Sequence, residues 1–303
     1  MKRTITVLPV FLICILFSSC KKTDLTASYI YIDANVFSID MANFNDEFAT
    51  AYDQGELECI ASHAFPDAWV IVNGTDLGTW ELPCKIPVLA KDNNTVQIFP
   101  GIKMNGVSTT RPRYAFTDAN TQTLNLKPSE ITRITSAPVK YYSTTQFKVI
   151  ENFERDYNGY FTSEDSNGVN FEHIYDVENP SNRIGRISLE DSIMDFNVLT
   201  SSMRFSNDVQ YVFLEMDYRC DVENAQIYAG VLVTKPTTVV ATDEPLVVVN
   251  ASTKWKKIYI NLTQAVLRNH TSEAVSYKVY LSGGRSDSTP LHYDFDNIKV
   301  IYR

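Results

Sequence analysis

The second half of the chain consists of short segments in which apolar and polar residues alternate, and turn-forming residues separate these segments. A period of two places successive side chains on opposite faces of a strand, so each segment can bury one face and expose the other. Several such segments in succession predict an antiparallel β-sandwich. The expected strands of this half cover residues 147–154, 171–177, 183–189, 211–219, 226–233, 246–249, 255–262, 277–281 and 295–302.

The first half of the chain also has the pattern of strands joined by tight turns. Asn73-Gly74 and Asn93-Asn94 suit the positive φ angles of hairpin turns. Residues 263–268 are the only stretch expected to form a helical turn, because no other stretch has a sustained helical period. The expected strands of the first half cover residues 29–33, 37–41, 56–61, 69–72, 86–89, 96–99, 124–127 and 131–134.

The two halves are expected to be separate domains. A length of 303 residues favours two domains, each large enough to bury its own core. The first strand pattern ends at residues 135–138, and a new pattern begins at Phe147. We therefore predict an all-β protein with a first β-sandwich over residues 29–138, a linker over 139–146 and a second β-sandwich over 147–303.

Part of the first domain resembles a known module. Residues 70–101 contain a Val-Asn-Gly turn, a step from Gly78 to Pro83 and a final hairpin. In these features they resemble a PEGA-type repeat, a small β-sandwich module of bacterial surface proteins. The resemblance implies a PEGA-like or Ig-like sandwich and, because its motifs are mostly turns, implies fold rather than activity.

Four stretches of the second domain resemble a jelly-roll carbohydrate-binding module of the galactose-binding-like type, in the same order. They cover residues 150–154, 211–218, 255–262 and 293–300. The resemblance implies a non-catalytic jelly roll that binds carbohydrate. A sugar site needs an aromatic platform with polar groups beside it. The candidates are Tyr157, Asn158, Tyr160 and Tyr228, each of which could instead be a packing residue.

The same resemblance implies a structural calcium ion where the first and last strands of such a module meet. Glu151 or Glu154, together with Asp296, occupy the matching stretches. Calcium takes about six to eight oxygen ligands, so backbone oxygens of residues 156–159 would have to contribute. The alternative is that these acids face water on alternating strands.

The first residues have the layout of a secretory signal, with basic Lys2 and Arg3 followed by an apolar run over residues 7–17. The run holds about eleven residues, whereas a membrane-spanning helix needs roughly twenty. Ser18-Ser19-Cys20 resembles a bacterial lipobox, which implies cleavage before Cys20 and acyl chains such as palmitate on its thiol. The alternative is an ordinary cleaved signal with an incidental cysteine.

A lipid on Cys20 would make the chain a membrane-anchored lipoprotein of the cell envelope. The expected organisation is a signal peptide over residues 1–19 and a lipidated tether over 20–28. Lys21 after the cysteine favours the outer membrane. Whether the protein faces the periplasm or the cell surface stays open.

The charge balance excludes polyanionic partners. The full chain has 27 Lys and Arg against 36 Asp and Glu, a net charge of −9, and loss of Lys2 and Arg3 with the signal leaves −11. Nucleic acids and anionic lipid surfaces need a basic face on their partner. We therefore expect no nucleic acid to bind, and we expect membrane contact only through the lipid.

No arrangement of residues indicates catalysis. The four histidines fall in no recognisable zinc spacing, and the chain has no nucleophile elbow, phosphate loop or dinucleotide fingerprint. Glycoside hydrolysis needs two carboxylates flanking a cleft, and no pair stands out. We expect a non-catalytic protein that binds a glycan or another envelope component. The alternative is an adhesion or assembly subunit that binds protein partners.

The cysteines allow one disulfide. Cys59 and Cys84 lie in the same predicted domain and could pair in an oxidising compartment. Sequence spacing does not determine how close their Cα atoms come, so a pair of free thiols is the alternative. Cys220 lies in an alternating segment and is expected to be a buried thiol.

Overall fold

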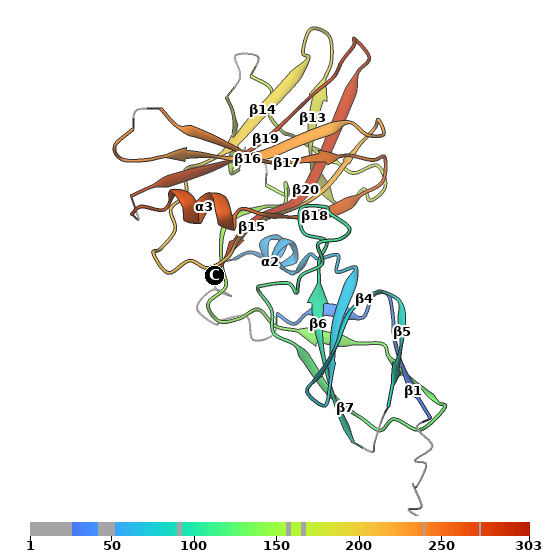
Figure 1. Cartoon of the computed structure of the whole chain (residues 1–303). Helices are drawn as coiled ribbons and strands as arrows, with labels where there is room; N and C mark the ends of the chain where they lie inside the picture. Colours follow the sequence, from blue (N-terminus) through green and yellow to red (C-terminus); the bar gives the residue numbers. More distant parts are fainter. Residues whose placement is uncertain are drawn as a thin grey trace, which may run out of the picture.

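The computed structural model describes residues 26–41, 52–89, 93–155, 159–164, 168–238, 240–272 and 274–303. Two groups of β-sheets lie end to end, with the N-terminal group at the bottom of Figure 1 and the C-terminal group at the top. The all-β prediction is confirmed. Cys20, Tyr157 and Asn158 lie outside the described residues.

The N-terminal part contains three small sheets around one core. The three-stranded sheet has the order β5-β1-β8, the four-stranded sheet has the order β4-β3-β6-β7, and β2 pairs with β9. The predicted turn at Asn73-Gly74 joins β3 to β4, and both residues have positive φ angles, of 51° and 78°. The strand bounds are β1 Ser28–Ile32, β2 Phe37–Ile39, β3 Asp67–Val72, β4 Thr75–Glu81, β5 Cys84–Val88, β6 Asn94–Gly101, β7 Asn120–Leu124, β8 Ile131–Ile134 and β9 Ala137–Val139.

The C-terminal part is a sandwich of two antiparallel sheets. One sheet has the order β12-β13-β20-β15-β18, with β10 also paired to β20, and the other has the order β11-β14-β19-β16-β17. The strand bounds are β10 Gln146–Glu151, β11 Phe161–Ser163, β12 Glu172–Tyr175, β13 Arg183–Leu189, β14 Asp195–Thr200, β15 Val212–Cys220, β16 Gln226–Thr234, β17 Thr242–Asn250, β18 Lys256–Asn261, β19 Ser276–Gly284 and β20 Leu291–Tyr302.

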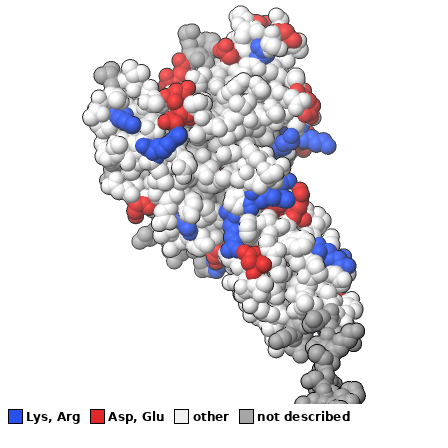
Figure 2. Space-filling view, in the orientation of Figure 1, with Lys and Arg blue, Asp and Glu red and all other residues white. Residues whose placement is uncertain are grey.

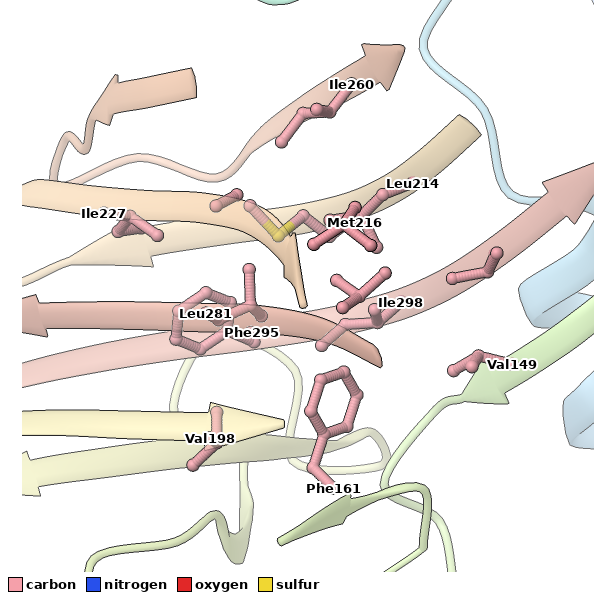
Figure 3. Packing of buried hydrophobic residues seen from close by; sticks show 14 of the residues in the cluster. Val149, Phe161, Val198, Leu214, Met216, Ile227, Ile260, Leu281, Phe295 and Ile298 are labelled. Atoms are coloured by element: carbon pink, nitrogen blue, oxygen red, sulfur yellow. The ribbon is translucent and has the colours of Figure 1, made fainter. Parts of the chain in front are cut away.

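The core of this sandwich comes from the inward-facing residues of both sheets. Met216 and Phe295 on one sheet face Ile227 and Leu281 on the other, and all four are buried (Figure 3). On β19, buried and more exposed residues alternate, as expected of a half-buried strand, whereas nearly every residue of β15 and β20 is buried. Cys220 is buried in the same core, as predicted.

The structure corrects one element of the prediction. Residues 56–61, expected as a strand, belong to helix α2, Gln54–Ala61. Its start is a capping box: Asp53 accepts the backbone N–H of Glu56 at 2.8 Å, and the Glu56 carboxylate accepts that of Asp53 at 2.9 Å. These bonds satisfy two amides that would otherwise lack partners, and so favour a helix there. The expected helical turn is α3, Thr263–Asn269.

The possible disulfide between Cys59 and Cys84 is not formed in this structure, which has the alternative of two free thiols. Cys59 and Cys84 are both free and buried, and they lie in different hydrophobic clusters. Cys59 is on α2, packed with Ile150, whereas Cys84 is on β5 in the N-terminal core. Burial raises the pKa of the Cys59 thiol to about 12 and that of Cys84 to about 11, so both are held as neutral thiols.

The two parts share a buried interface. Phe213, Tyr259 and Ile301 lie on strands of the six-stranded sheet, yet they pack with the N-terminal core. The rings of Phe213 and Phe116 are 5.4 Å apart at their centroids. On the face drawn in Figure 2, basic and acidic side chains gather where the two parts meet. The predicted linker therefore joins two bodies that are in extensive contact.

The buried ammonium group of Lys299 crosses this interface. Lys299 on β20 is fully buried, and its Nζ donates to the carbonyl oxygens of Cys59, Ile60 and Ser62 at 3.1, 2.9 and 2.8 Å. The same Nζ lies 3.3 Å from a carboxylate oxygen of Glu215 on β15. These contacts join the end of α2 to the six-stranded sheet.

Candidate functional site

A groove of about 730 Å³ lies on the outer face of the five-stranded sheet. Four strands of this sheet, β14, β19, β16 and β17, contribute to its floor and walls. Its polar side chains are Asp195, Asn197, Asp243 and Ser282. Its larger side chains that are not buried are Tyr228, Tyr280, Leu232 and Pro245.

Strand register brings these side chains together. Asn197 on β14 pairs with Ser282 on β19, and Ser282 pairs with Tyr228 on β16. Paired residues of an antiparallel sheet point to the same face, so an amide, a hydroxyl and a phenol form one row across three strands. The Tyr228 side chain is 43% exposed, and its hydroxyl donates to Gln226 Oε1 at 2.6 Å.

Tyr280 lies across the neighbouring strand. A Cβ built on Gly230 would come within 2.4 Å of the Tyr280 hydroxyl oxygen and 2.5 Å of its ring carbon Cζ, so the phenol rests on the backbone of β16. Only glycine leaves room for this approach. The Tyr280 hydroxyl reaches Asp243 on β17. Burial, followed by the negative charge of Asp243, raises the pKa of Tyr280 to about 12.

The groove has an acidic character. Among the described residues, its lining includes the carboxylates of Asp195 and Asp243 but no Lys or Arg. Two phenol rings supply flat apolar faces, and carboxylates, an amide and a hydroxyl supply acceptors and donors beside them. This combination suits a neutral ligand that has both C–H faces and hydroxyl groups.

The fold does not bring the described sugar-site candidates, Tyr160 and Tyr228, into one site. Tyr228 lies in the groove. Tyr160 lies elsewhere, beside a smaller hollow that Glu151 and Arg155 also line, and its backbone N–H donates to Glu151 Oε2 at 3.1 Å. Tyr160 therefore does not contribute to the groove that contains Tyr228.

The carboxylates predicted to bind calcium each have protein donors. Both oxygens of the buried Glu151 accept backbone N–H groups, from Phe153 and Tyr160. Glu154 Oε1 accepts the backbone N–H of Arg183 at 2.8 Å, and Asp296 accepts from Asn182 and from the backbone of Asn297. Within the described part of the chain, no three His, Cys, Asp or Glu residues form a group that could hold a metal ion.

Sequence reasoning missed most of the groove. Asp195 and Asn197 lie on β14, a strand that was not expected. Tyr280 lies in an expected strand, two residues before Ser282, so the two side chains point to the same face of the sheet. The exposure of that face could be inferred from the alternation of apolar and polar residues. The contact of Tyr280 with Gly230 depends on the pairing of two strands, which alternation alone does not reveal.

No helix of the described residues is long and apolar enough to cross a membrane. A search of protein-family models and a search of curated proteins both found no match.

Several solved structures are similar to about half of the chain. The family 30 carbohydrate-binding module of a cellulosomal cellulase of Clostridium thermocellum is 16% identical with a TM-score of 0.39, over 50% of this chain and 97% of that one. The family 11 module from the same organism, in complex with a β-1,3-1,4-mixed-linked tetrasaccharide, is 13% identical with a TM-score of 0.36, over 52% of this chain and 94% of that one. A xylan-binding domain from Paenibacillus barcinonensis is also 13% identical, with a TM-score of 0.37 and the same coverage.

Proposed function

We propose that this chain is a non-catalytic, membrane-anchored lipoprotein of the cell envelope whose C-terminal sandwich binds carbohydrate in the groove over β14, β19, β16 and β17. One observation supports carbohydrate as the class of ligand. The Tyr280 ring lies over Gly230, next to the exposed Tyr228 ring, in a groove lined by polar side chains. Sugar rings stack their C–H faces on aromatic rings and need hydrogen-bonding partners for their hydroxyls.

The N-terminal part would act as a spacer between membrane and groove. In this proposal Cys20 carries the lipid, and the PEGA-like resemblance of residues 70–101 fits a structural role. Strand β1, the first described strand, lies near the bottom of Figure 1, and the sheet with the groove lies at the top. Calcium has no part in the proposal, because Glu151, Glu154 and Asp296 already accept hydrogen bonds from protein donors.

A protein partner is the second candidate, favoured by the outermost strand β17. This strand is at the edge of its sheet, and Val248 on it is 52% exposed. However, Pro245 cannot donate a backbone hydrogen bond, and a register shift between Ala229 and Gly230 interrupts the pairing of β16 with β17. These features discourage another strand from adding to β17, so carbohydrate is the better-supported ligand.

A glycan array followed by calorimetry on the mature protein tests the proposed function. Tyr280→Ala and Tyr228→Ala should each weaken binding of the best glycan by at least about tenfold, because each removes a ring from the groove. Tyr175→Ala is the matched control, since Tyr175 is 64% exposed on β12 of the other sheet. Absence of any glycan binding, or equal losses in all three variants, would refute the carbohydrate site.

A further inference from the structure

A second hollow, of about 320 Å³, adjoins the groove at the end of the sandwich. It lies between the turn from β15 to β16, at residues 222–225, and the hairpin from β19 to β20, at residues 284–291. Gly284, the last residue of β19, lines both this hollow and the groove. We refer to the second hollow as the loop cleft.

No side chain separates the groove from the loop cleft at Gly284. This glycine is exposed, and a Cβ there would have Met194 O as its nearest neighbour, at 3.2 Å. From Tyr280 to Gly284 the strand advances four residues, which corresponds to about 14 Å. The open path therefore runs along β19 from the aromatic platform, over Ser282, into the loop cleft.

Charged groups along this path are mostly acidic. Asp195 and Asp243 line the groove, and Glu223 and Asp287 line the loop cleft. Arg285 is the one cation that lines the path in the described part of the chain. Its Nε and Nη2 donate to the backbone carbonyl oxygens of Ile193 and Asp191, at 2.9 and 2.6 Å. An anionic ligand would meet more repulsion than attraction along this path.

We propose that the groove and the loop cleft form one continuous site that binds an extended, uncharged oligosaccharide through several consecutive sugars. This inference rests on the proposed function, because it assigns the chain length and charge of the same ligand. Sugars near Tyr280 and Tyr228 stack on rings, and sugars beyond Gly284 contact the residues of the two loops. Affinity therefore increases with the length of the oligosaccharide.

The test uses calorimetry with disaccharides to hexasaccharides of the neutral glycan that binds best on the array. For the wild-type protein, affinity should rise by at least about tenfold from the shortest to the longest ligand. Gly284→Leu places a side chain across the path and should abolish that gain in affinity with ligand length. Gly284→Ala, with its small side chain, should keep most of the gain.

Ser286→Leu adds volume inside the loop cleft at a position outside strand β19, and it provides a second variant if Gly284→Leu fails to fold. This variant should also reduce the increase in affinity with oligosaccharide length. Oligogalacturonates of matched length should bind at least about tenfold more weakly than the neutral series, because each of their sugars carries a carboxylate.

The outcomes separate the two proposals. If no glycan binds, both the proposed function and this inference are wrong. If glycans bind but affinity is the same for all lengths, or if neither loop-cleft variant changes the gain, the continuous site is wrong while the groove remains. Equal binding of oligogalacturonates would overturn the assignment of an uncharged ligand.

Discussion

Asp296 is a buried carboxyl group whose ionisation opposes folding. Its carboxylate accepts hydrogen bonds from Asn182 Nδ2 at 3.0 Å and from the backbone N–H of Asn297 at 2.7 Å. Burial is the largest influence and raises the pKa of Asp296 to about 7, although both hydrogen bonds act in the opposite direction. Because the folded pKa lies above the unfolded value of about 3.9, the stability this group contributes is complete below about pH 4 and is lost as the pH rises through 7.

Asp296→Asn should therefore remove part of the pH dependence of stability. Relative to this variant, the wild-type free energy of unfolding should fall between about pH 4 and pH 7, by at most about 4 kcal/mol. Urea denaturation of both proteins at about pH 5 and about pH 8 measures the difference. A difference between the two proteins that is the same at both pH values would contradict the assignment.

A second prediction at the scale of single residues is that Cys20, near the N-terminus, carries a lipid. Cys20→Ala should abolish incorporation of radiolabelled palmitate and move the protein from the membrane fraction to the soluble fraction, because the thiol is the attachment point. Ser19→Ala keeps a small residue before the cysteine and should still be labelled. Membrane association of Cys20→Ala equal to that of the wild type would count against the lipid anchor.

Most strands could be predicted from the sequence, because apolar and polar residues alternate along a strand that has one buried and one exposed face. Arg183–Leu189 has the predicted bounds, and most other predicted strands lie within a few residues of the observed ones. Strand β14 was missed because Asp195 and Asn197 are residue types common in turns. Helix α2 was mistaken for a strand because its short apolar segment is ambiguous without the cap.

The groove was harder to predict than the fold, for a related reason. Tyr228 could be proposed from residue type and alternation, both of which are local. The platform also requires Gly230 opposite Tyr280, a pair made by residues that are 50 positions apart in the chain and joined only by the register of β16 and β19. Such pairings are a property of the folded sheet.

The cap of α2 can be tested at the element scale. Asp53→Ala should lower the free energy of unfolding by about 1 kcal/mol or more, because it removes both the cap and the ion pair between Asp53 and Arg155. Asp53→Asn should cost less, because an Asn side chain can still accept the Glu56 N–H. Equal losses in the two variants, measured by urea denaturation, would mean that the ion pair and not the cap is the source of the stability.

At the scale of the whole molecule, the interface should make the described chain unfold as one unit. Lys299→Met should lower the free energy of unfolding by about 3–5 kcal/mol, because Glu215 and three carbonyl oxygens lose their buried partner. Adding Glu215→Gln should restore part of this loss, since the unpaired charge is removed. Differential calorimetry should show one transition for the wild type, and two well-separated transitions would contradict a shared interface.

The buried contact of Lys299 with the end of α2 also affects how many copies could act together. In the proposed lipid-anchored form, a flexible joint would let the groove of each copy turn independently of the N-terminal part, whereas a stiff joint would keep the groove at a fixed distance and orientation relative to that part. In a crowded membrane, neighbouring copies would then present their grooves in similar orientations to one long polymer. Once the first copy has bound the polymer, further binding events occur at a high effective concentration, so weak single-site affinity can become firm retention of a polysaccharide.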